Sequence, residues 1–329
     1  MNSFREFLHA HESFLLTGHE NPDGDCVGAE SSFSHLLRAL GKRVHIVNPD
    51  PLSSSFDFLG RHTTFQSARN GEELPDFDAA ILLDCAHLSR VGSRPGSLGM
   101  RLRESGKPIG VIDHHVGSEK GDGKAAYVDA TAAATGALVR RLFREFDVPL
   151  TLEAAEGVFL SLVSDTGWFR YSNADAEVFA MASELVGLGV DSAGVYDALH
   201  RRNHPESPAV LADCVRRHRL LLDNKLAMVS LDKSMVERCS RTEFDTDAVM
   251  EPLRSIAGVE VVALLKERFD GGVKCSLRAR GDVDVQAIVT EFGGGGHKKA
   301  AGATMSMTLG EAEAAVERGV QQALLAMGG

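Results

Sequence analysis

The chain has 329 residues, of which 35 are basic and 46 acidic, giving a formal net charge of −11. This charge excludes a basic nucleic-acid coat protein, whose surface would be positive. An apolar content of 43% with 25% charged residues argues against intrinsic disorder, and the length favours two domains over one.

The first half of the chain alternates short apolar runs with segments of helical periodicity. Several runs are apolar at successive positions, as in strands that are covered on both faces of a parallel sheet. This alternation predicts a doubly wound, mainly parallel α/β domain. The expected strands are residues 14–17, 44–47, 79–83, 109–112 and 126–128. The expected helices are residues 29–40 with Gly41 just after the end, 135–146, and 152–163 with Thr151 as N-cap.

The pattern changes near residue 190. The segment RRNHPESP, residues 201–208, is polar and contains two prolines, which indicates a linker or hinge. We therefore predict a first domain over residues 1–190, a linker over 191–209 and a smaller α/β domain over 210–329. In the second domain the expected strands are 226–231, 260–265 and 273–277, with Gly271 and Gly272 in a hairpin turn, and the expected helices are 285–292 and 309–325.

Targeting and cysteine signals are weak. No apolar run approaches the roughly 18 residues that a membrane span needs. The opening residues MNSFREFLHAHE lack the uncharged core of a signal peptide. We expect a cytoplasmic protein with no membrane partner. Five cysteines without a CxxC pair predict reduced thiols rather than a disulfide framework or a thiolate zinc site.

Acidic and imidazole side chains follow the predicted strands at the edge where open α/β sheets bind ligands. Any one of them alone is more simply a turn or helix-capping residue. Four segments that bring such groups to one edge indicate a site. The residues are His19, Asp23 and Asp25 after the first strand, Asp84 after the third, Asp113, His114 and His115 after the fourth, and Asp165 after the helix over 152–163.

The crowded carboxylates indicate divalent cations, because uncompensated like charges raise one another's pKa and oppose folding. An EF-hand is excluded for the first loop, since its sixth position is Cys26 rather than glycine and its twelfth is Ser32 rather than glutamate. Carboxylates and imidazoles without thiolates suit Mn²⁺, with Mg²⁺, Co²⁺, Fe²⁺ or Zn²⁺ as lesser candidates. Six ligands are too many for one ion with an open position, so we predict two ions that share a bridging carboxylate, roughly 3.5–4 Å apart.

These residues carry a resemblance to a known family. The set His19-x3-Asp23-x-Asp25, Asp84, Asp113-His114-His115 and Asp165 resembles the DHH phosphoesterase superfamily. The stretch GGGGHKKAAG, residues 293–302, resembles the glycine-rich signature of the DHH-associated second domain, and Ser276-Leu277-Arg278 resembles the substrate-arginine segment of that domain. Together the matches span residues 19 to 302.

The resemblance implies a role for each candidate. Asp84 would bridge two Mn²⁺ ions, and His115 would face the substrate phosphate as a charge-stabilising or proton-handling group. Asp113 would orient the histidines through hydrogen bonds. Water activated by the ions would be the nucleophile, so no protein nucleophile is required. The metal ligands would be His19 and Asp23 for one ion, Asp25 and His114 for the other, with Asp84 between them and Asp165 completing the cluster; the catalytic candidates are Asp84, Asp113 and His115.

The glycine run has two interpretations. Four glycines are commonly a flexible linker, but here they lie between a predicted helix and His297, inside a domain. Glycine backbone N–H groups can approach an anion closely, and the Walker A pattern is absent. We predict that the run binds substrate phosphate together with Arg278, whose guanidinium offers a planar fork. The substrate-binding candidates are His115, Arg278, Gly294, Gly295, Gly296 and His297.

The two-domain layout resembles the branch of nanoRNases and phosphatases of 3′-phosphoadenosine 5′-phosphate (pAp). It implies a hydrolase that releases mononucleotides from RNA oligonucleotides of two to five residues and AMP from pAp, in a cleft between the domains. The net charge of −11 and the aromatic content of 6% count against long duplex nucleic acid as a partner. A homodimer stays open.

Other functions also stay open. A phosphodiesterase of cyclic dinucleotides or pApA would use the same site. A RecJ-like single-strand exonuclease normally carries extra modules, and an inorganic pyrophosphatase has a different second domain. A non-catalytic nucleotide sensor would use the same pocket without turnover. Trp168, Phe169 and Tyr171 would either stack a base or pack in the core.

Overall fold

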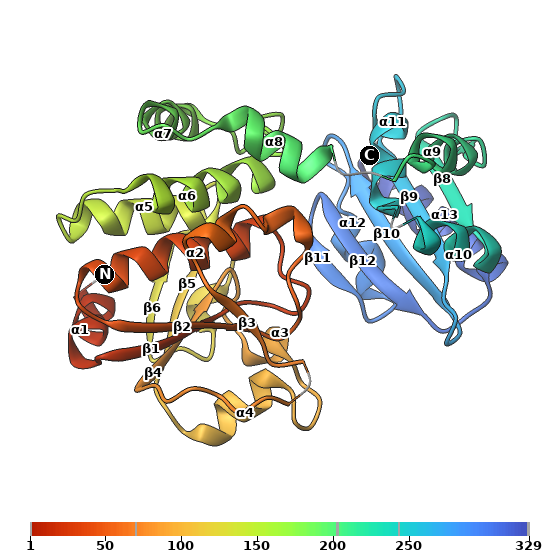
Figure 1. Cartoon of the computed structure of the whole chain (residues 1–329). Coiled ribbons are helices and arrows are strands. Elements are labelled where there is room, and N and C mark those ends of the chain that lie inside the picture. The colour runs from red at the N-terminus through yellow and green to blue at the C-terminus, as the bar shows by residue number, and fades with distance from the viewer. Residues whose placement is uncertain (1, 70, 202–203, 243, 328–329) are drawn as a thin grey trace. The chain divides into compact units, whose positions relative to one another are not determined.

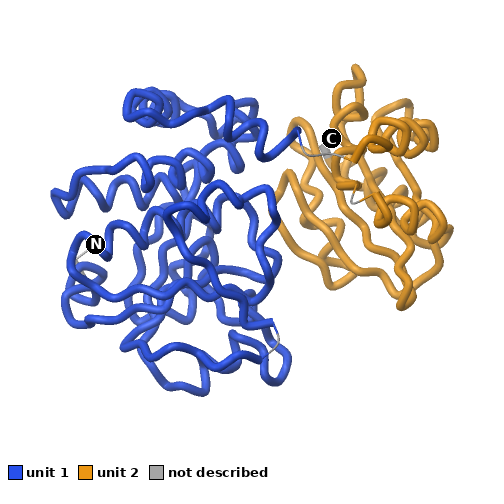
Figure 2. Tube along the Cα trace, in the orientation of Figure 1, with its two compact units in different colours: residues 1–202 blue, residues 203–329 orange. Residues whose placement is uncertain are grey.

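The computed structural model describes residues 2–69, 71–201, 204–242 and 244–327. The chain forms two compact units, residues 1–202 and 203–329 (Figure 2). Each unit has its own sheet and its own hydrophobic core. The expected α/β class, with a parallel first sheet and a second α/β unit, is confirmed.

The first unit is built on a six-stranded parallel sheet in the order β3-β2-β1-β4-β5-β6. The strand order reverses beside β1: β2 and β3 follow on one side of β1, and β4, β5 and β6 follow on the other. All five predicted strands are present, and the short edge strand β3 adds to them. The strands are β1 (Ser13–Thr17), β2 (Arg43–Asn48), β3 (Phe65–Ser67), β4 (Ala79–Leu83), β5 (Ile109–Asp113) and β6 (Ala125–Val128).

Helices cover both faces of this sheet (Figure 1). One face packs α1, α2 and α5 against side chains such as Phe14 and Ile81, and the other packs α3 and α4 against Leu15 and Leu82. Neighbouring strand residues therefore point to opposite cores, which explains the uninterrupted apolar runs in the sequence. These helices are α1 (Asn2–Ala10), α2 (Gly24–Ala39), α3 (Leu88–Val91), α4 (Leu98–Ser105) and α5 (Thr135–Glu145).

Helix α6 (Leu152–Asp165) packs directly on α2, backbone against backbone. A Cβ atom at Gly28 would overlap the Gly157 carbonyl oxygen, and one at Gly157 would lie 2.7 Å from the Gly28 carbonyl oxygen. The Ser32 hydroxyl donates across the contact to the Ala154 carbonyl, at 2.8 Å. Only small residues permit this approach. Helices α7 (Ala176–Gly187) and α8 (Ser192–His200) then pack against the outer side of α6.

The second unit contains a mixed six-stranded sheet in the order β11-β12-β10-β9-β8-β7, in which only β8 and β9 pair in parallel. One face packs against α12 and α13, and the other against α9, α10, η4 and α11. Its strands are β7 (Arg219–Leu221), β8 (Leu226–Leu231), β9 (Val261–Glu267), β10 (Val273–Ala279), β11 (Gly295–His297) and β12 (Ala300–Met305). Its helices are α9 (Ser207–Val215), α10 (Lys233–Arg241), η4 (Thr246–Val249), α11 (Met250–Arg254), α12 (Val285–Thr290) and α13 (Leu309–Met327).

Several elements differ from the expected ones. Helix α2 begins at Gly24, five residues before the predicted start, so it includes part of the first acidic motif. The expected linker over residues 191–209 contains α8 and the start of α9. The turn at Gly271 and Gly272 forms as expected, with φ of 102° and 75°. Among the described residues no single helix has the length and hydropathy to cross a membrane; α7 and α8 meet that test only jointly, across a 106° bend.

Candidate metal centre

The strand ends bring the predicted acidic and imidazole residues to one edge of the first sheet. His19 follows β1, Asp84 follows β4 directly, and Asp113 is the last residue of β5. Because β1 and β4 are neighbours where the strand order reverses, their carboxyl ends flank the point at which open α/β sheets bind ligands. Asp165 reaches the same edge as the last residue of α6.

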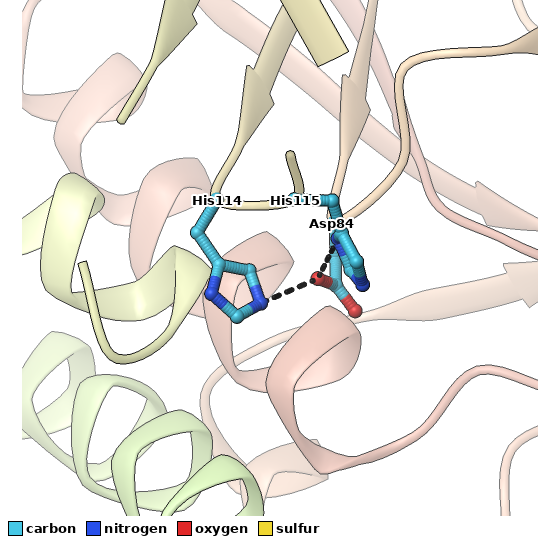
Figure 3. A group of neighbouring side chains, drawn as sticks. All are labelled: Asp84, His114 and His115. Carbon is cyan, nitrogen blue, oxygen red and sulfur yellow. Dashed lines mark ion pairs between the residues drawn. The ribbon is translucent and has the colours of Figure 1, made fainter. Parts of the chain in front are cut away.

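Asp84 lies at the centre of the cluster. Its Oδ1 is 3.6 Å from Nε2 of His114 and 3.6 Å from Nδ1 of His115, so the two adjacent histidines approach it from different sides (Figure 3). Its Oδ2 is 3.4 Å from Nε2 of His19. Asp84 is buried and has a φ of 59°, in the left-handed region that is uncommon for residues other than glycine but is adopted more readily by Asp than by most.

The histidines His19 and His114 are held in an orientation that suits metal binding. Nδ1 of His19 lies 2.9 Å from the Glu20 carbonyl oxygen, and Nδ1 of His114 lies 3.2 Å from the Ala132 carbonyl oxygen. Since a carbonyl can only accept, Nδ1 carries a proton, and each Nε2 faces the carboxylates, where a cation could take the place of a second proton. The buried Nε2 of His114 lies 3.1 Å from Oδ2 of Asp165 without forming a well-aligned hydrogen bond among the described residues. A cation would satisfy it.

Asp25 is fixed by the start of another helix. Its carboxylate accepts hydrogen bonds from the backbone N–H groups of Thr135, at 2.9 Å, and Gly136, at 3.2 Å, and from the hydroxyl of Ser161. Helix α5 begins after Ala134, whose methyl side chain cannot accept a hydrogen bond from the free N–H groups of the first turn. Asp25 therefore supplies from α2 the acceptor that the α5 N-terminus needs. It still lies 3.5 Å from Nε2 of His114.

Asp23 is the N-cap of α2 as well as a candidate ligand. Its Oδ1 accepts from the backbone N–H groups of Asp25 and Cys26, at 3.0 and 3.1 Å, and lies 3.9 Å from Nε2 of His19. Gly24, the next residue, lies within the helix, where a Cβ atom would overlap the Ser164 side chain on α6. The glycine is needed for helix packing rather than for a turn.

Asp113 orients one of the two histidines that follow it. Its carboxylate accepts from Nδ1 of His115 at 2.7 Å, from the backbone N–H of His115 at 3.1 Å, and from the hydroxyl of Ser118 at 2.5 Å. Burial alone would raise the pKa of Asp113, but these hydrogen bonds and the His115 charge bring it below its usual value. We expected Asp113 to orient both histidines; His114 is instead held by the Ala132 carbonyl.

Without cations the cluster carries an electrostatic conflict. Burial and the charge of Asp165 raise the pKa of Asp25 to about 6, and burial and the charge of Asp25 raise the pKa of Asp84. Burial works against the protonated form of His114, but the neighbouring carboxylates raise its pKa to about 10. Divalent cations among these side chains would supply the missing positive charge.

The donor set fits two cations. Three groups place one ligand atom from each member within 4.8 Å of the others, and Asp84 and His114 each belong to two groups. Oxygen and imidazole donors without thiolates suit divalent metals such as Mn²⁺. The structure brings together all six predicted ligands. The groups are His19 with Asp23 and Asp84, Asp25 with His114 and Asp165, and Asp84 with His114 and His115.

The sequence interpretation missed a buried network beside this cluster. Glu30 on α2 is fully buried and accepts a hydrogen bond from Nδ2 of Asn48, at 2.8 Å. Burial raises its pKa to about 7, although the hydrogen bond from Asn48 and the charge of His19 oppose this. Ser161, which holds Asp25, was also missed. A helix-phase count from Asp165 places it one turn earlier on the same face, so a signal for Ser161 was available.

Apart from His115, the predicted substrate residues lie in the second unit, where Arg278 and His297 share one face of the sheet. Arg278 pairs with Ala300 across β10 and β12, and Ala300 pairs with His297 across β12 and β11, so Arg278 and His297 belong to one cross-strand row. The Arg278 guanidinium lies 3.4 Å from the Asp247 carboxylate. The glycine run is not a linker, since Gly295 and Gly296 pair with β12. A Cβ atom at Gly294 would overlap the Gly302 carbonyl oxygen.

The aromatic residues after Asp165 divide between the two expected roles. Trp168 packs between α6 and α8, and Phe169 packs between α6 and α7. The indole N–H of Trp168 donates to Nε2 of His200, at 2.7 Å. Tyr171 is 39% exposed. Core packing thus accounts for two of the three.

Comparison with known proteins agrees with this architecture. Residues 13–162 match the model of the DHH family N-terminal domain, and residues 237–323 match the DHHA1 domain. A relative from Thermus thermophilus, named bifunctional oligoribonuclease and PAP phosphatase NrnA, is 32% identical over 306 residues, which are 93% of this chain and 88% of the relative. A relative of the same name from Bacillus subtilis is 23% identical, with 90% of each chain covered.

A solved structure shares the fold. The exopolyphosphatase-related protein from Bacteroides fragilis superposes with a TM-score of 0.86 at 21% identity, covering 98% of this chain and 95% of the other. With the identity to the Thermus relative over nearly the whole chain, the family assignment follows. The chain belongs to the DHH phosphoesterase family and consists of a DHH domain followed by a DHHA1 domain.

Proposed function

We propose that this chain is a metal-dependent phosphoesterase that hydrolyses RNA oligonucleotides of two to five residues to mononucleotides, and pAp to AMP. The observation that carries the proposal is the set of three ligand groups that share Asp84 and His114 at the edge of the parallel sheet. The substrate class is supported by the names of the relatives from Thermus thermophilus and Bacillus subtilis, which align over most of this chain.

In this proposal the six ligand residues would hold two divalent cations such as Mn²⁺, and Asp84 belongs to two of the three ligand groups. Bound divalent cations acidify water and neutralise the phosphate. The protein holds the ligands in place: the Glu20 and Ala132 carbonyls fix the two ligand imidazoles, and the α5 N-terminus fixes Asp25. His115, oriented by Asp113, contacts the phosphate and handles a proton or stabilises charge there.

We propose further that the second unit holds the rest of the substrate through Arg278, His297 and the glycines Gly294 to Gly296. The shared cross-strand row of Arg278 and His297 supports this. A phosphate would exchange with Asp247 at the Arg278 guanidinium, because a bidentate anion suits the planar fork at least as well as the present 3.4 Å ion pair.

One turnover screen tests the proposal. Purified protein loaded with Mn²⁺ is incubated with pAp, pApA, cyclic di-AMP and pyrophosphate, and products are separated by chromatography. We expect AMP from pAp and pApA, and no turnover by Asp84→Ala. Titration calorimetry with Mn²⁺ is run in parallel, since a protein that binds manganese but turns over none of these compounds would retain the metal site and lose the substrate assignment.

The same screen separates the alternatives. Faster turnover of cyclic di-AMP than of pAp would assign a cyclic dinucleotide phosphodiesterase. Cleavage of thirty-residue strands faster than dinucleotides would assign a RecJ-like exonuclease. Tight nucleotide binding without any turnover would assign a sensor.

A further inference from the structure

A small pocket adjoins the metal centre on the side of His115. The loops after β4 and β5 enclose about 220 Å³ between Asp84 and His115 on one side and His87 and Arg90 on the other. This volume is below the roughly 300–1,000 Å³ of sites that take drug-sized ligands, so the pocket suits a single small group such as a phosphate. Asp84 and His115 thus belong both to this pocket and to the cluster already described.

Arg90 brings an uncompensated positive charge to this pocket. Its guanidinium makes no hydrogen bond or ion pair with any residue that the structure describes. The nearby carboxylate of Asp122 is engaged elsewhere: it accepts from the Leu88 backbone N–H at 2.7 Å and lies 3.9 Å from both His87 and Arg103. Two acids line the pocket itself: Asp113 is bound to His115 and Ser118, and Asp84 faces the imidazoles of His19, His114 and His115.

The backbone that carries Arg90 is tied to the first metal motif. The Arg90 carbonyl accepts a hydrogen bond from the backbone N–H of Glu20, the residue after His19, at 2.8 Å. On either side of Arg90, Leu88 is 3% exposed and Val91 is fully buried. Helix α3 is thus anchored by its core contacts and by this hydrogen bond, and Arg90 projects from a fixed position beside the ligands.

We propose that Arg90 binds the phosphate that the metal centre hydrolyses, through the pocket next to His115. This inference rests on the proposed phosphoesterase function. When one oxygen of a phosphate faces the metal centre, its other oxygens can enter the pocket. A guanidinium can donate hydrogen bonds to two of these oxygens at once. Arg90 then shares the phosphate with His115 and stabilises negative charge on it as the bond to the leaving oxygen breaks.

The test uses an arginine pair on one segment. Arg90→Ala and Arg90→Lys are compared with Arg94→Ala, because Arg94 is also exposed and without a partner in the described structure but does not line the pocket. All are loaded with Mn²⁺, and kcat and KM for pAp are measured together with competitive inhibition by inorganic phosphate. Arg90 is exposed, so the variants should unfold at the temperature of the unmodified protein.

We expect Arg90→Ala to lose roughly 10- to 100-fold in kcat/KM and to weaken inhibition by phosphate by a similar factor, as for loss of a hydrogen bond to a charged group. Arg90→Lys should fall between, since it keeps the charge without the fork. Arg94→Ala should match the unmodified protein.

Two results would overturn the inference. In one, Arg90→Ala behaves like Arg94→Ala in turnover and in phosphate inhibition. In the other, Arg90→Ala loses activity and calorimetry shows that it also binds Mn²⁺ more weakly. Arg90 would then only help to position the metal ligands and would not bind the phosphate. If the unmodified protein shows no turnover, the proposed function is wrong. Calorimetry of phosphate binding to the Mn²⁺-loaded protein and to Arg90→Ala would still test the role of Arg90 separately.

Discussion

Replacement of the buried Glu30 by glutamine should stabilise the protein at alkaline pH and leave its stability unchanged in acid. Glu30 is fully buried, and its pKa is raised from the ordinary 4.5 to about 7. The folded state therefore favours the protonated form. Glu30 leaves the free energy of unfolding undiminished below pH 4.5, reduces it progressively between pH 4.5 and about 7, and has its full effect above pH 7.

The size of the effect follows from the pKa. One pKa unit is worth about 1.4 kcal/mol, so a rise from 4.5 to about 7 corresponds to about 3 kcal/mol above pH 7. The geometry agrees, since Oδ1 of Asn48 is buried and lacks a hydrogen-bond partner in the described residues. A protonated Glu30, or the amide of a glutamine, can donate to this oxygen, whereas a carboxylate cannot.

The assay is urea unfolding of the full chain in EDTA at pH 5 and pH 8, followed by the fluorescence of Trp168, the single tryptophan, which lies in the first unit. Glu30→Gln should unfold with up to about 3 kcal/mol more free energy than the unmodified protein at pH 8, and with less than about 1 kcal/mol more at pH 5. Glu6→Gln, at an exposed position of α1, is the control and should show no pH-dependent difference. An equal difference between Glu30→Gln and the unmodified protein at both pH values would refute the reasoning.

Two further predictions concern the supports of the two sites. Ser161→Ala removes one of the hydrogen bonds to Asp25, so Mn²⁺ affinity measured by calorimetry should fall roughly 10-fold, as for other residues that orient metal ligands. The control is Ser34→Ala, which loses a buried hydroxyl on α2 that donates to the Ser31 carbonyl and should leave Mn²⁺ affinity unchanged. Equal affinities for both variants would contradict the role of Ser161. Gly296→Ala should destabilise the second unit by roughly 2 kcal/mol or more in thermal unfolding, because φ is 137° and the new Cβ would lie 2.5 Å from the Ala300 carbonyl oxygen. In Gly295→Ala the new Cβ would have no atom within 4 Å, so this control should leave the unfolding temperature nearly unchanged. If both variants lost the same stability, the clash at Gly296 could not be the cause.

The long elements of the first unit could be predicted because their signals are local. Strands such as β4 are apolar at every position, and this reflects burial on both faces of the sheet. Helix α6 begins after Thr151, whose hydroxyl accepts from the Ala154 N–H as an N-cap should. Short edge elements such as β3 have too few residues for a period to be visible.

The candidate ligands could be predicted because they follow strands whose carboxyl ends must meet at one edge. The groups that hold them could not be predicted in the same way. The Asp25 carboxylate binds the start of α5, which is 110 residues further along the chain, and this contact depends on tertiary packing. The early start of α2 has a local cause, since Asp23 has the side chain of an N-cap and could have been recognised as one.

The glycine contact between α2 and α6 has a consequence for how the enzyme can change. Asp25 lies on one of these helices and Asp165 ends the other, so the gap between two ligands depends on backbones that touch rather than on the bulk of neighbouring side chains. Substitutions among the aliphatic residues elsewhere in the domain can therefore accumulate without moving these two carboxylates apart. A single methyl group at Gly28 or Gly157 would push the helices apart and change the distance between Asp25 and Asp165.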